Sequence, residues 1–203
     1  MSGLEFVYKI PESEVLIPNA NPLATTPLDN LSLVAPSEEI LRTSLLPFDF
    51  KEPPVNPVEL AHRMVRYMRD HNGLGLSANQ LGLPFRAFAM VSEPNFVCFN
   101  PFLVGHGEEE EGLEEGCLTY PGLFVKVKRW KSIKVRFTMP NGEVVNKTFA
   151  GMTARIFQHE LDHLNGEIPL GKTSRITLQT ALEKARKKYR KNYRLKDLLN
   201  VSL

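Results

Sequence analysis

The chain has few cysteines, no long apolar run and almost no excess of charge of one sign. Its two cysteines, Cys98 and Cys117, are too few for the disulfide framework of a small secreted domain, and they favour a reducing compartment. No stretch approaches the ~20 apolar residues of a membrane span. With 203 residues, 42% of them hydrophobic, and a net charge of +2, the composition predicts a soluble globular protein with a sizeable core.

The amino-terminal segment is poor in basic residues. The first fifty positions contain only Lys9 and Arg42 on the basic side, whereas acidic residues recur from Glu5 to Asp49. That balance is atypical of a secretory or organelle-targeting leader. Residues 1–35 are rich in Pro, Asn and Leu, which predicts an extended arm, with a short strand at residues 5–10.

Two histidines and a glutamate form an H-E-x-x-H pattern, His159-Glu160-Leu161-Asp162-His163, in a segment predicted to be helical. At ~100° of turn and ~1.5 Å of rise per residue, the two histidines lie one turn apart on the same side. They can therefore bind one divalent ion, with Glu160 placed to exchange protons with a water on that ion. An amphipathic helix that carries these residues by chance is the alternative, and the pattern favours the metal.

No histidine follows His163, so the downstream third ligand of the usual zinc proteases must be sought elsewhere. The acidic residues beyond it are Glu167, Glu183 and Asp197. The last two lie in a strongly basic tail. Upstream, Cys117 follows a glycine that permits close approach of the backbone, and its thiolate would complete a three-ligand site with one open position. Alone, this cysteine would be taken for a small buried hydrophobic residue.

A glycine-rich segment, residues 73–80, precedes both features and reads GLGLSANQ. No Gly-Lys-Ser/Thr follows it, which excludes a phosphate-binding loop. Its glycines can bring backbone N–H and C=O groups against an extended ligand, and Gln80 can offer an amide N–H to a developing oxyanion. Without the other two features, such a segment would be interpreted as a simple turn.

In this order, the three segments resemble the motifs GxGxAAxQ, EGCxS and HExDH of the peptide deformylase family, here GLGLSANQ, EGCLT and HELDH. That family removes the formyl group from N-formylmethionine at the start of nascent chains. The resemblance extends to Phe99-Asn100-Pro101 and to residues 151–155, and it covers about residues 38–172. Ser77 replaces an alanine, Asn79 fills a variable position and Thr119 replaces a serine. These small changes are expected to bear on substrate preference rather than on activity.

The resemblance implies the roles of the site residues. The ligands of one divalent metal are Cys117, His159 and His163. That metal would be Fe(II) in the cell, with Zn or Ni often found instead in purified protein. Glu160 is expected to take a proton from water as general base and to pass it to the leaving amine. The Gln80 side chain and the Leu118 backbone N–H are the expected donors to the tetrahedral oxyanion.

The family holds its substrate as an extended strand, which implies main-chain contacts on both sides of the peptide. These contacts are expected from Leu74, Gly75 and Gly116. A pocket for the methionine side chain is expected from Leu74, Tyr120, Met152, the stem of Arg155, and Ile156. Plain core packing is the alternative for the apolar members of this set.

The element pattern predicts an α+β fold, with antiparallel strands wrapped around a central metal-binding helix, an amino-terminal helix and a carboxy-terminal helix. The amino-terminal helix is predicted from Asn56-Pro57 to Gly73, by its cap and its glycine stop. The metal-binding helix is predicted from Gly151 or Met152 to Asn165-Gly166. Strands are predicted at residues 85–91, 96–99, 125–128, 133–138 and 144–149. Residues 1–203 are expected to form a single domain.

The carboxy-terminal segment, residues 174–203, is predicted to be a basic helix that reaches at least Tyr189. Its basic residues are Lys184, Arg186, Lys187, Lys188, Arg190, Lys191, Arg194 and Lys196. A solvated face is one interpretation, and docking to ribosomal RNA is the other, because the expected substrate emerges from a ribosome. Formyl-methionyl nascent peptides are the expected partners, without a membrane or DNA. The expected location is the cytoplasm, or an equivalent reducing compartment where formylated chains are made.

Two further charged features are Asp162 and the acidic run Glu108–Glu111. Asp162 is expected to lie behind the metal with a cation such as Arg129, although a solvated helix charge is the alternative. The run Glu108–Glu111 is expected to be a solvated loop.

Two rival functions are a non-catalytic ribosome-associated binding protein and a peptidase with the same metal site. The first is disfavoured because every catalytic position is filled, and the second because Cys117 and Gln80 suit a small formyl group.

Overall fold

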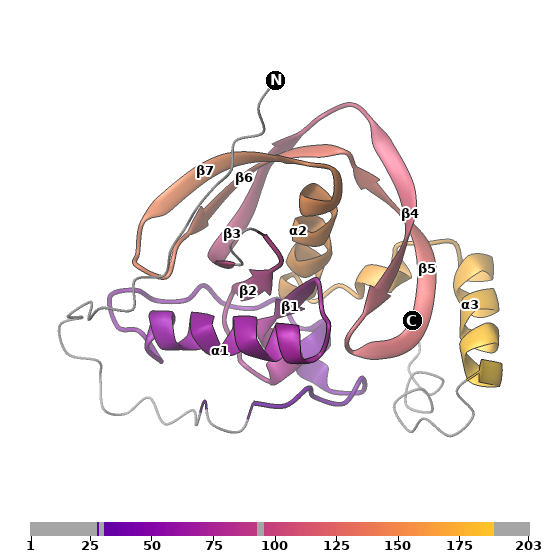
Figure 1. The fold of residues 1–203 in the computed structure, drawn as a ribbon, viewed down its shortest axis with the longest axis horizontal. Coiled ribbons are helices and arrows are strands. Elements are labelled where there is room, and N and C mark those ends of the chain that lie inside the picture. Colours follow the sequence, from indigo (N-terminus) through magenta and orange to yellow (C-terminus); the bar gives the residue numbers. More distant parts are fainter. Residues whose placement is uncertain (1–27, 29–30, 93–95, 189–203) are drawn as a thin grey trace.

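The computed structural model describes residue 28, residues 31–92 and residues 96–188 (Figure 1). Its strands are antiparallel and its helices are few, which confirms the predicted α+β class. The main elements are α1 (Pro57–Asp70), β1 (Gly75–Ser77), β2 (Ala87–Met90), β3 (Phe96–His106), β4 (Glu110–Cys117), β5 (Tyr120–Trp130), β6 (Ser132–Thr138), β7 (Val144–Ala150), α2 (Gly151–Leu164) and α3 (Arg175–Lys188). None of the helices in this described part is long and apolar enough to cross a membrane.

The strands form two sheets around α2. The larger sheet has the order β1-β2-β3-β6-β7, and β4 pairs with β5 in a separate long hairpin. In Figure 1, β6 and β7 arch over α2, while the β4–β5 hairpin passes along its side toward α3. Helix α2 contacts β1, β2, β5 and β7. The helix that carries both histidines is therefore enclosed by strands from both sheets.

Helix α1 begins and ends as the sequence predicts. The side chain of Asn56 caps it by accepting hydrogen bonds from the backbone N–H groups of Val58 and Glu59, both at 3.0 Å. Its buried side chains are Pro57, Leu60, Ala61, Met64 and Met68. They pack in one core cluster with Leu76, Phe85 and Phe99. This packing fixes the point at which the chain enters the glycine-rich segment.

Helix α2 follows β7 without a loop, through Gly151 at φ 59°, a left-handed conformation that favours glycine. Every side chain from Ala154 to Leu164 is buried. Phe157, Leu161 and Leu164 belong to a second core cluster with residues of the larger sheet. Because no face of α2 is open to solvent over this stretch, its polar side chains must be satisfied inside the protein.

The predicted strands are present, but two others were not predicted. Strand β1 lies inside the glycine-rich segment, and β4 begins at Glu110, so the prediction of a solvated loop over Glu108–Glu111 is wrong for Glu110 and Glu111. Half of the residues of β4 are exposed and only Glu115 is buried, and such a strand lacks the apolar alternation by which strands are recognised. The predicted strand at residues 5–10 and Tyr189 lie outside the described residues.

Helix α3 packs against the hairpin through one face. Leu178, Leu182 and Ala185 are buried in a third cluster with residues of β5. Its opposite face is exposed, including Ile176 with 81% of its surface accessible. This helix therefore forms a wall beside β5, as Figure 1 shows.

Candidate metal centre and catalytic site

Three side chains with metal-binding atoms converge where β4 ends beside α2. The donor atoms of Cys117, His159 and His163 lie within 4.8 Å of one another. The sulfur of Cys117 is 3.2 Å from Nε2 of His163. Both imidazoles are buried, whereas the cysteine is partly accessible. The fold thus brings together the three residues that the sequence predicts as ligands.

The electrostatics of this cluster suit a cation. Burial lowers the pKa of His163 well below 6.5, which keeps the imidazole in its neutral, ligand form. Burial also lowers the pKa of His159, but hydrogen bonds to Cys117 and Glu115 outweigh it and raise that pKa to about 10. The protein therefore stabilises a positive charge at His159, between the sulfur of Cys117 and the carboxylate of Glu115. A divalent ion bound by the three residues would supply that charge in place of the proton.

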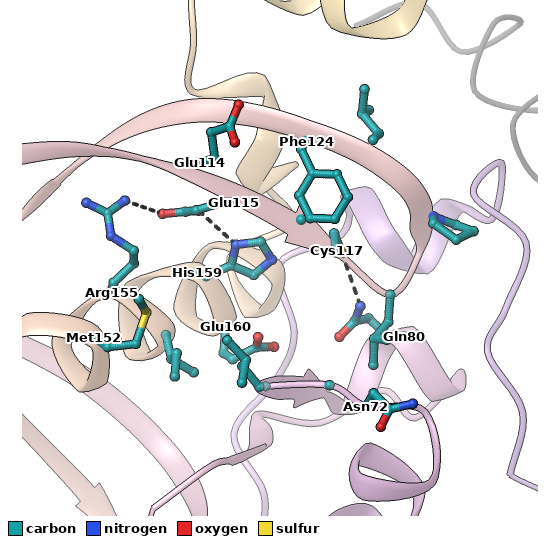
Figure 2. Close-up of a pocket in the computed structure, with 18 of the residues that line it drawn as sticks. Asn72, Gln80, Glu114, Glu115, Cys117, Phe124, Met152, Arg155, His159 and Glu160 are labelled. Carbon is teal, nitrogen blue, oxygen red and sulfur yellow. Dashed lines mark hydrogen bonds and ion pairs between the residues drawn. The ribbon is translucent and has the colours of Figure 1, made fainter. Parts of the chain in front are cut away.

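Glu115 is the functional residue that the sequence analysis missed. Its Oε2 accepts a hydrogen bond from Nδ1 of His159 at 2.9 Å, which leaves the other ring nitrogen for a metal (Figure 2). Arg129 donates to both of its oxygens, at 3.0 and 2.9 Å. Arg155 adds a third contact at 2.6 Å. The sequence carried no signal for this role, because β4 was not predicted and its pairing with β5 is irregular between Gly116 and Cys117.

The same network contains Asp162 and confirms its predicted partner. Arg129 donates to Asp162 at 2.5 Å, and Lys172 contacts the other oxygen at 2.6 Å. The carboxylates of Glu115 and Asp162 are both buried. Arg129, Arg155 and His159 contact Glu115, and Arg129 and Lys172 contact Asp162. Buried charges are tolerated when they are paired in this way. The network fixes one side of α2 against the β4–β5 hairpin.

Replacing Glu115 by Gln should lower the free energy of unfolding in a pH-dependent manner. Burial raises the pKa of Glu115, but hydrogen bonds from His159 and Arg129 bring it down to about 2, below its ordinary 4.5. Its stabilisation is therefore complete above about pH 4.5 and is lost as the pH falls toward 2. We expect a deficit of about 3 kcal/mol at pH 7 in denaturant unfolding with a chelator present.

The matched control for this variant is Glu114→Gln, because Glu114 is the exposed neighbour on the same strand. Its change should stay within about 0.5 kcal/mol. A deficit for Glu115→Gln that is equal at pH 7 and pH 3 would show that its charge does not stabilise the fold.

Glu160 lies beside the ligands and is buried, with 3% of the residue accessible. Burial raises its pKa to about 7, although the charge of His159 and a hydrogen bond from Ser77 act in the opposite direction. Ser77 Oγ donates to Oε2 of Glu160 at 2.8 Å. A Cβ at Gly75 would overlap the carboxylate, so only glycine fits there. A carboxylate with a pKa near neutrality is suited to exchange protons at physiological pH.

Gln80 lies below Cys117 in Figure 2, and a dashed line joins the two side chains. Its Nε2 donates to Thr119 Oγ1 at 2.9 Å and lies 3.5 Å from the sulfur of Cys117. Its Oε1 accepts the backbone N–H of Ser77 at 2.8 Å, which fixes the orientation of the amide. Leu118 follows Cys117 in the tight turn between β4 and β5. Both predicted oxyanion donors therefore border the same space.

The three residues that differ from the family motifs contact catalytic or ligand residues. Ser77 holds Glu160, Asn79 donates to the backbone oxygen of His163 at 2.6 Å, and Thr119 accepts from Gln80. None of the three lines the cavity described below. They support catalytic and ligand residues, and the expectation that they bear on substrate preference stays a prediction.

A cavity of about 410 Å³ opens in front of the metal-binding cluster. Cys117, His159 and Glu160 lie at its inner end, together with Gln80 and Leu118. Its rim carries three exposed apolar side chains, Leu74, Met152 and Phe124, each 53–59% accessible. An apolar mouth with polar and charged groups at the base is the usual form of a small-ligand site.

The expected substrate-binding residues largely line this cavity. Those that do are Leu74, Gly75, Gly116, Met152, Arg155 and Ile156. Tyr120 does not, and its assignment to the methionine pocket is corrected. Its ring is buried, with only 2% of the residue accessible, in the cluster that joins β5 to α3. The guanidinium of Arg155 is held by Glu115, so only the stem of this residue can face a ligand.

Comparison with known proteins agrees with this geometry. A family model described as polypeptide deformylase matches residues 31–179. The peptide deformylase of Thermotoga petrophila is 42% identical over 113 residues, which cover 55% of this chain and 69% of that protein. The peptide deformylase of Rhodopseudomonas palustris is 31% identical over 161 residues, covering 75% and 87% of the two chains.

Solved structures give the same answer. The peptide deformylase of Thermotoga maritima superposes with a TM-score of 0.66 at 35% identity, covering 71% of this chain and 97% of that one. A plant peptide deformylase superposes with a TM-score of 0.71 at 30% identity, covering 82% and 91%. The chain belongs to the polypeptide deformylase family, the metal-dependent hydrolases that remove the formyl group from the amino terminus of new polypeptides.

Proposed function

We propose that this chain deformylates N-formylmethionine with a metal held by Cys117, His159 and His163. The observation that carries the proposal is the convergence of these three donors within 4.8 Å, directly beside a buried glutamate whose pKa is about 7. The donor set of one sulfur and two imidazoles suits a first-row divalent ion and leaves a coordination position open. A peptide fits the cavity in front of it.

Each catalytic group has a task that its position supports. A metal held by Cys117, His159 and His163 would supply Lewis-acid polarisation and a nucleophile at neutral pH. Glu160 accepts the proton of the attacking water and returns it to the amine that leaves. Gln80 Nε2 and the Leu118 backbone N–H donate to the oxygen of the tetrahedral intermediate. Ser77 and Gly75 hold the Glu160 carboxylate in place, and Glu115 orients the His159 ring.

The substrate lies as an extended strand along the rim of the cavity. Backbone groups of Leu74, Gly75 and Gly116 contact its main chain. The methionine side chain enters the apolar part bordered by Leu74, Met152, Ile156 and the stem of Arg155. Support comes from the exposure of Leu74 and Met152 at the mouth. A structure of a related deformylase from Acinetobacter baumannii, with a TM-score of 0.65 at 30% identity and covering 70% and 98% of the two chains, contains bound Met-Ala-Ser.

The test of this function is the release of formate from formyl-Met-Ala-Ser by protein purified without oxygen. Formate should be released from this peptide. Unformylated Met-Ala-Ser should remain intact, and so should a peptide whose amino terminus carries a different blocking group. Cleavage of an internal peptide bond would instead support the peptidase. Absence of any hydrolysis with metal bound would support a non-catalytic binding protein.

The ion is Fe(II) in the cell, and Zn or Ni replaces it in protein handled in air. The sulfur ligand and the two imidazoles are acceptable to all three ions, so the proposal depends on the behaviour that the family resemblance implies. Elemental analysis of protein purified under strict anaerobic conditions tests it. Iron should be the stoichiometric metal, and zinc in its place would contradict the assignment.

The remaining proposals concern the whole chain. Residues 1–203 form one domain in the cytoplasm or an equivalent reducing compartment. The predicted arm over residues 1–35 lies almost entirely outside the described residues, and of the basic helix predicted over residues 174–203 the structure describes α3. The two free cysteines are consistent with a reducing location. Of the basic tail, Lys184 and Lys187 are exposed on α3, whereas the residues from 189 onward lie outside the described part. The tail docks on ribosomal RNA.

Reversing Arg186, Lys187, Arg190 and Lys191 to Glu should abolish co-sedimentation with ribosomes at low salt. Contacts with phosphates are largely electrostatic, so wild-type binding should fall steeply as salt rises. Turnover of a short formyl peptide should not change, because the tail contributes no metal ligand. Equal co-sedimentation of the reversed protein would show that the tail is a solvated face.

A further inference from the structure

A second groove adjoins the cavity and shares part of its lining. It has a volume of about 460 Å³ and lies between the β4–β5 hairpin and α3. The cavity and the groove share three lining residues, Glu114, Gly122 and Phe124. Phe124 is 59% exposed and stands above the Cys117 end of the hairpin (Figure 2). A chain that leaves the cavity across Phe124 therefore enters the groove directly.

One wall of the groove is the free face of α3. Ile176, Thr180 and Lys184 line it at four-residue intervals, which places them on one face of the helix. The opposite face, with Leu178 and Leu182, is buried against β5. Ile176 is 81% exposed, a large apolar side chain open to solvent. The wall is thus apolar at one end and cationic at the other.

The other wall comes from β5 and repeats this arrangement. Phe124 and Lys126 are exposed and alternate with Leu123, Val125 and Val127, which are buried. Lys126 and Lys184 both line the groove, against the single carboxylate of Glu114 at the junction with the cavity. The groove therefore offers two exposed apolar side chains and two positive charges. An extended segment that contains apolar and acidic residues complements it.

We infer that this groove binds the part of the substrate polypeptide that follows the residues held in the cavity, with a preference for apolar and acidic residues. The inference rests on the proposed function. A nascent polypeptide is far longer than a cavity of 410 Å³ can hold, so most of it lies outside. The shared residues make the groove the continuation of the cavity, and the two lysines select the sign of charge.

Formyl octapeptides that share the start Met-Ala-Ser test this inference. One continues with Leu-Glu-Glu-Leu-Glu and the other with Gly-Lys-Lys-Gly-Lys, and formyl-Met-Ala-Ser alone is the reference. The acidic octapeptide should have a KM lower than that of the lysine octapeptide by on the order of fivefold at low salt, with similar kcat. The difference should shrink as salt rises, because exposed charges are screened.

Two matched variants locate the effect. Lys184 and Lys187 are both exposed on α3, but only Lys184 lines the groove. Lys184→Glu should reverse the order of the two KM values, while Lys187→Glu should leave it as in the wild type. Equal KM values for the two octapeptides, or equal effects of the two variants, would overturn the groove as a binding site while deformylation stands. No formate from any of the three peptides would overturn the proposed function and this inference together.

Discussion

Glu160→Gln should bind a full equivalent of metal, keep the fold and lose nearly all turnover of formyl-Met-Ala-Ser. The amide has almost the shape of the carboxylate and can still occupy the space beside Gly75. It cannot accept the proton of the attacking water or deliver one to the leaving amine. General acid–base assistance typically contributes ~10²- to 10⁴-fold, so we expect kcat to fall by about three orders of magnitude.

The control for this variant is Glu143→Gln, which changes an exposed glutamate between β6 and β7. It should retain wild-type turnover and metal content. If Glu160→Gln kept more than about a tenth of the wild-type kcat, proton transfer by this residue would be worth less than ~1.4 kcal/mol. The role given to Glu160 would then be wrong.

Each of Cys117→Ser, His159→Ala and His163→Ala should leave the protein with much less than one equivalent of metal. Only three side chains of the protein bind the ion, so each substitution removes one of the three bonds that hold it. Turnover of the formyl peptide should be lost in parallel. Elemental analysis after dialysis against metal-free buffer gives the metal content directly.

Matched controls separate the site from general damage. Cys98→Ala removes the other free cysteine, which is buried in the core of the larger sheet, and it should keep its metal. His106→Ala removes a histidine that stacks on Trp130 away from the cluster, and it should also keep its metal. Stoichiometric metal in any one of the three ligand variants would contradict the assignment of that residue.

The elements that the sequence predicted well have signals that are local. The cap of α1 is made by Asn56, and its apolar spacing is regular, so both its start and its buried face could be predicted. The two histidines of α2 are four residues apart, and helix geometry alone brings them together. Cys117 could not be placed by geometry, because it is 42 residues from His159, and it was found through the resemblance of the motif around it.

The residues that were missed depend on tertiary contacts. Glu115 looks like one member of an acidic strand, and only the arrival of Arg129, Arg155 and His159 from other elements makes it part of the site. Tyr120 was expected in the methionine pocket that the family resemblance implies. Its direction is set by pairing between β4 and β5, which turns it toward α3 instead.

The dependence of formate release on metal at Cys117, His159 and His163 is measured most directly by titration of the stripped protein. Protein freed of metal with a chelator should release no formate from formyl-Met-Ala-Ser. Anaerobic addition of Fe(II) should restore the rate in proportion to bound metal and reach its maximum at one equivalent, and the Cys117→Ser protein should remain inactive throughout. Full formate release by the metal-free protein, or equal restoration of the Cys117→Ser protein, would contradict a metal-dependent deformylase at this site.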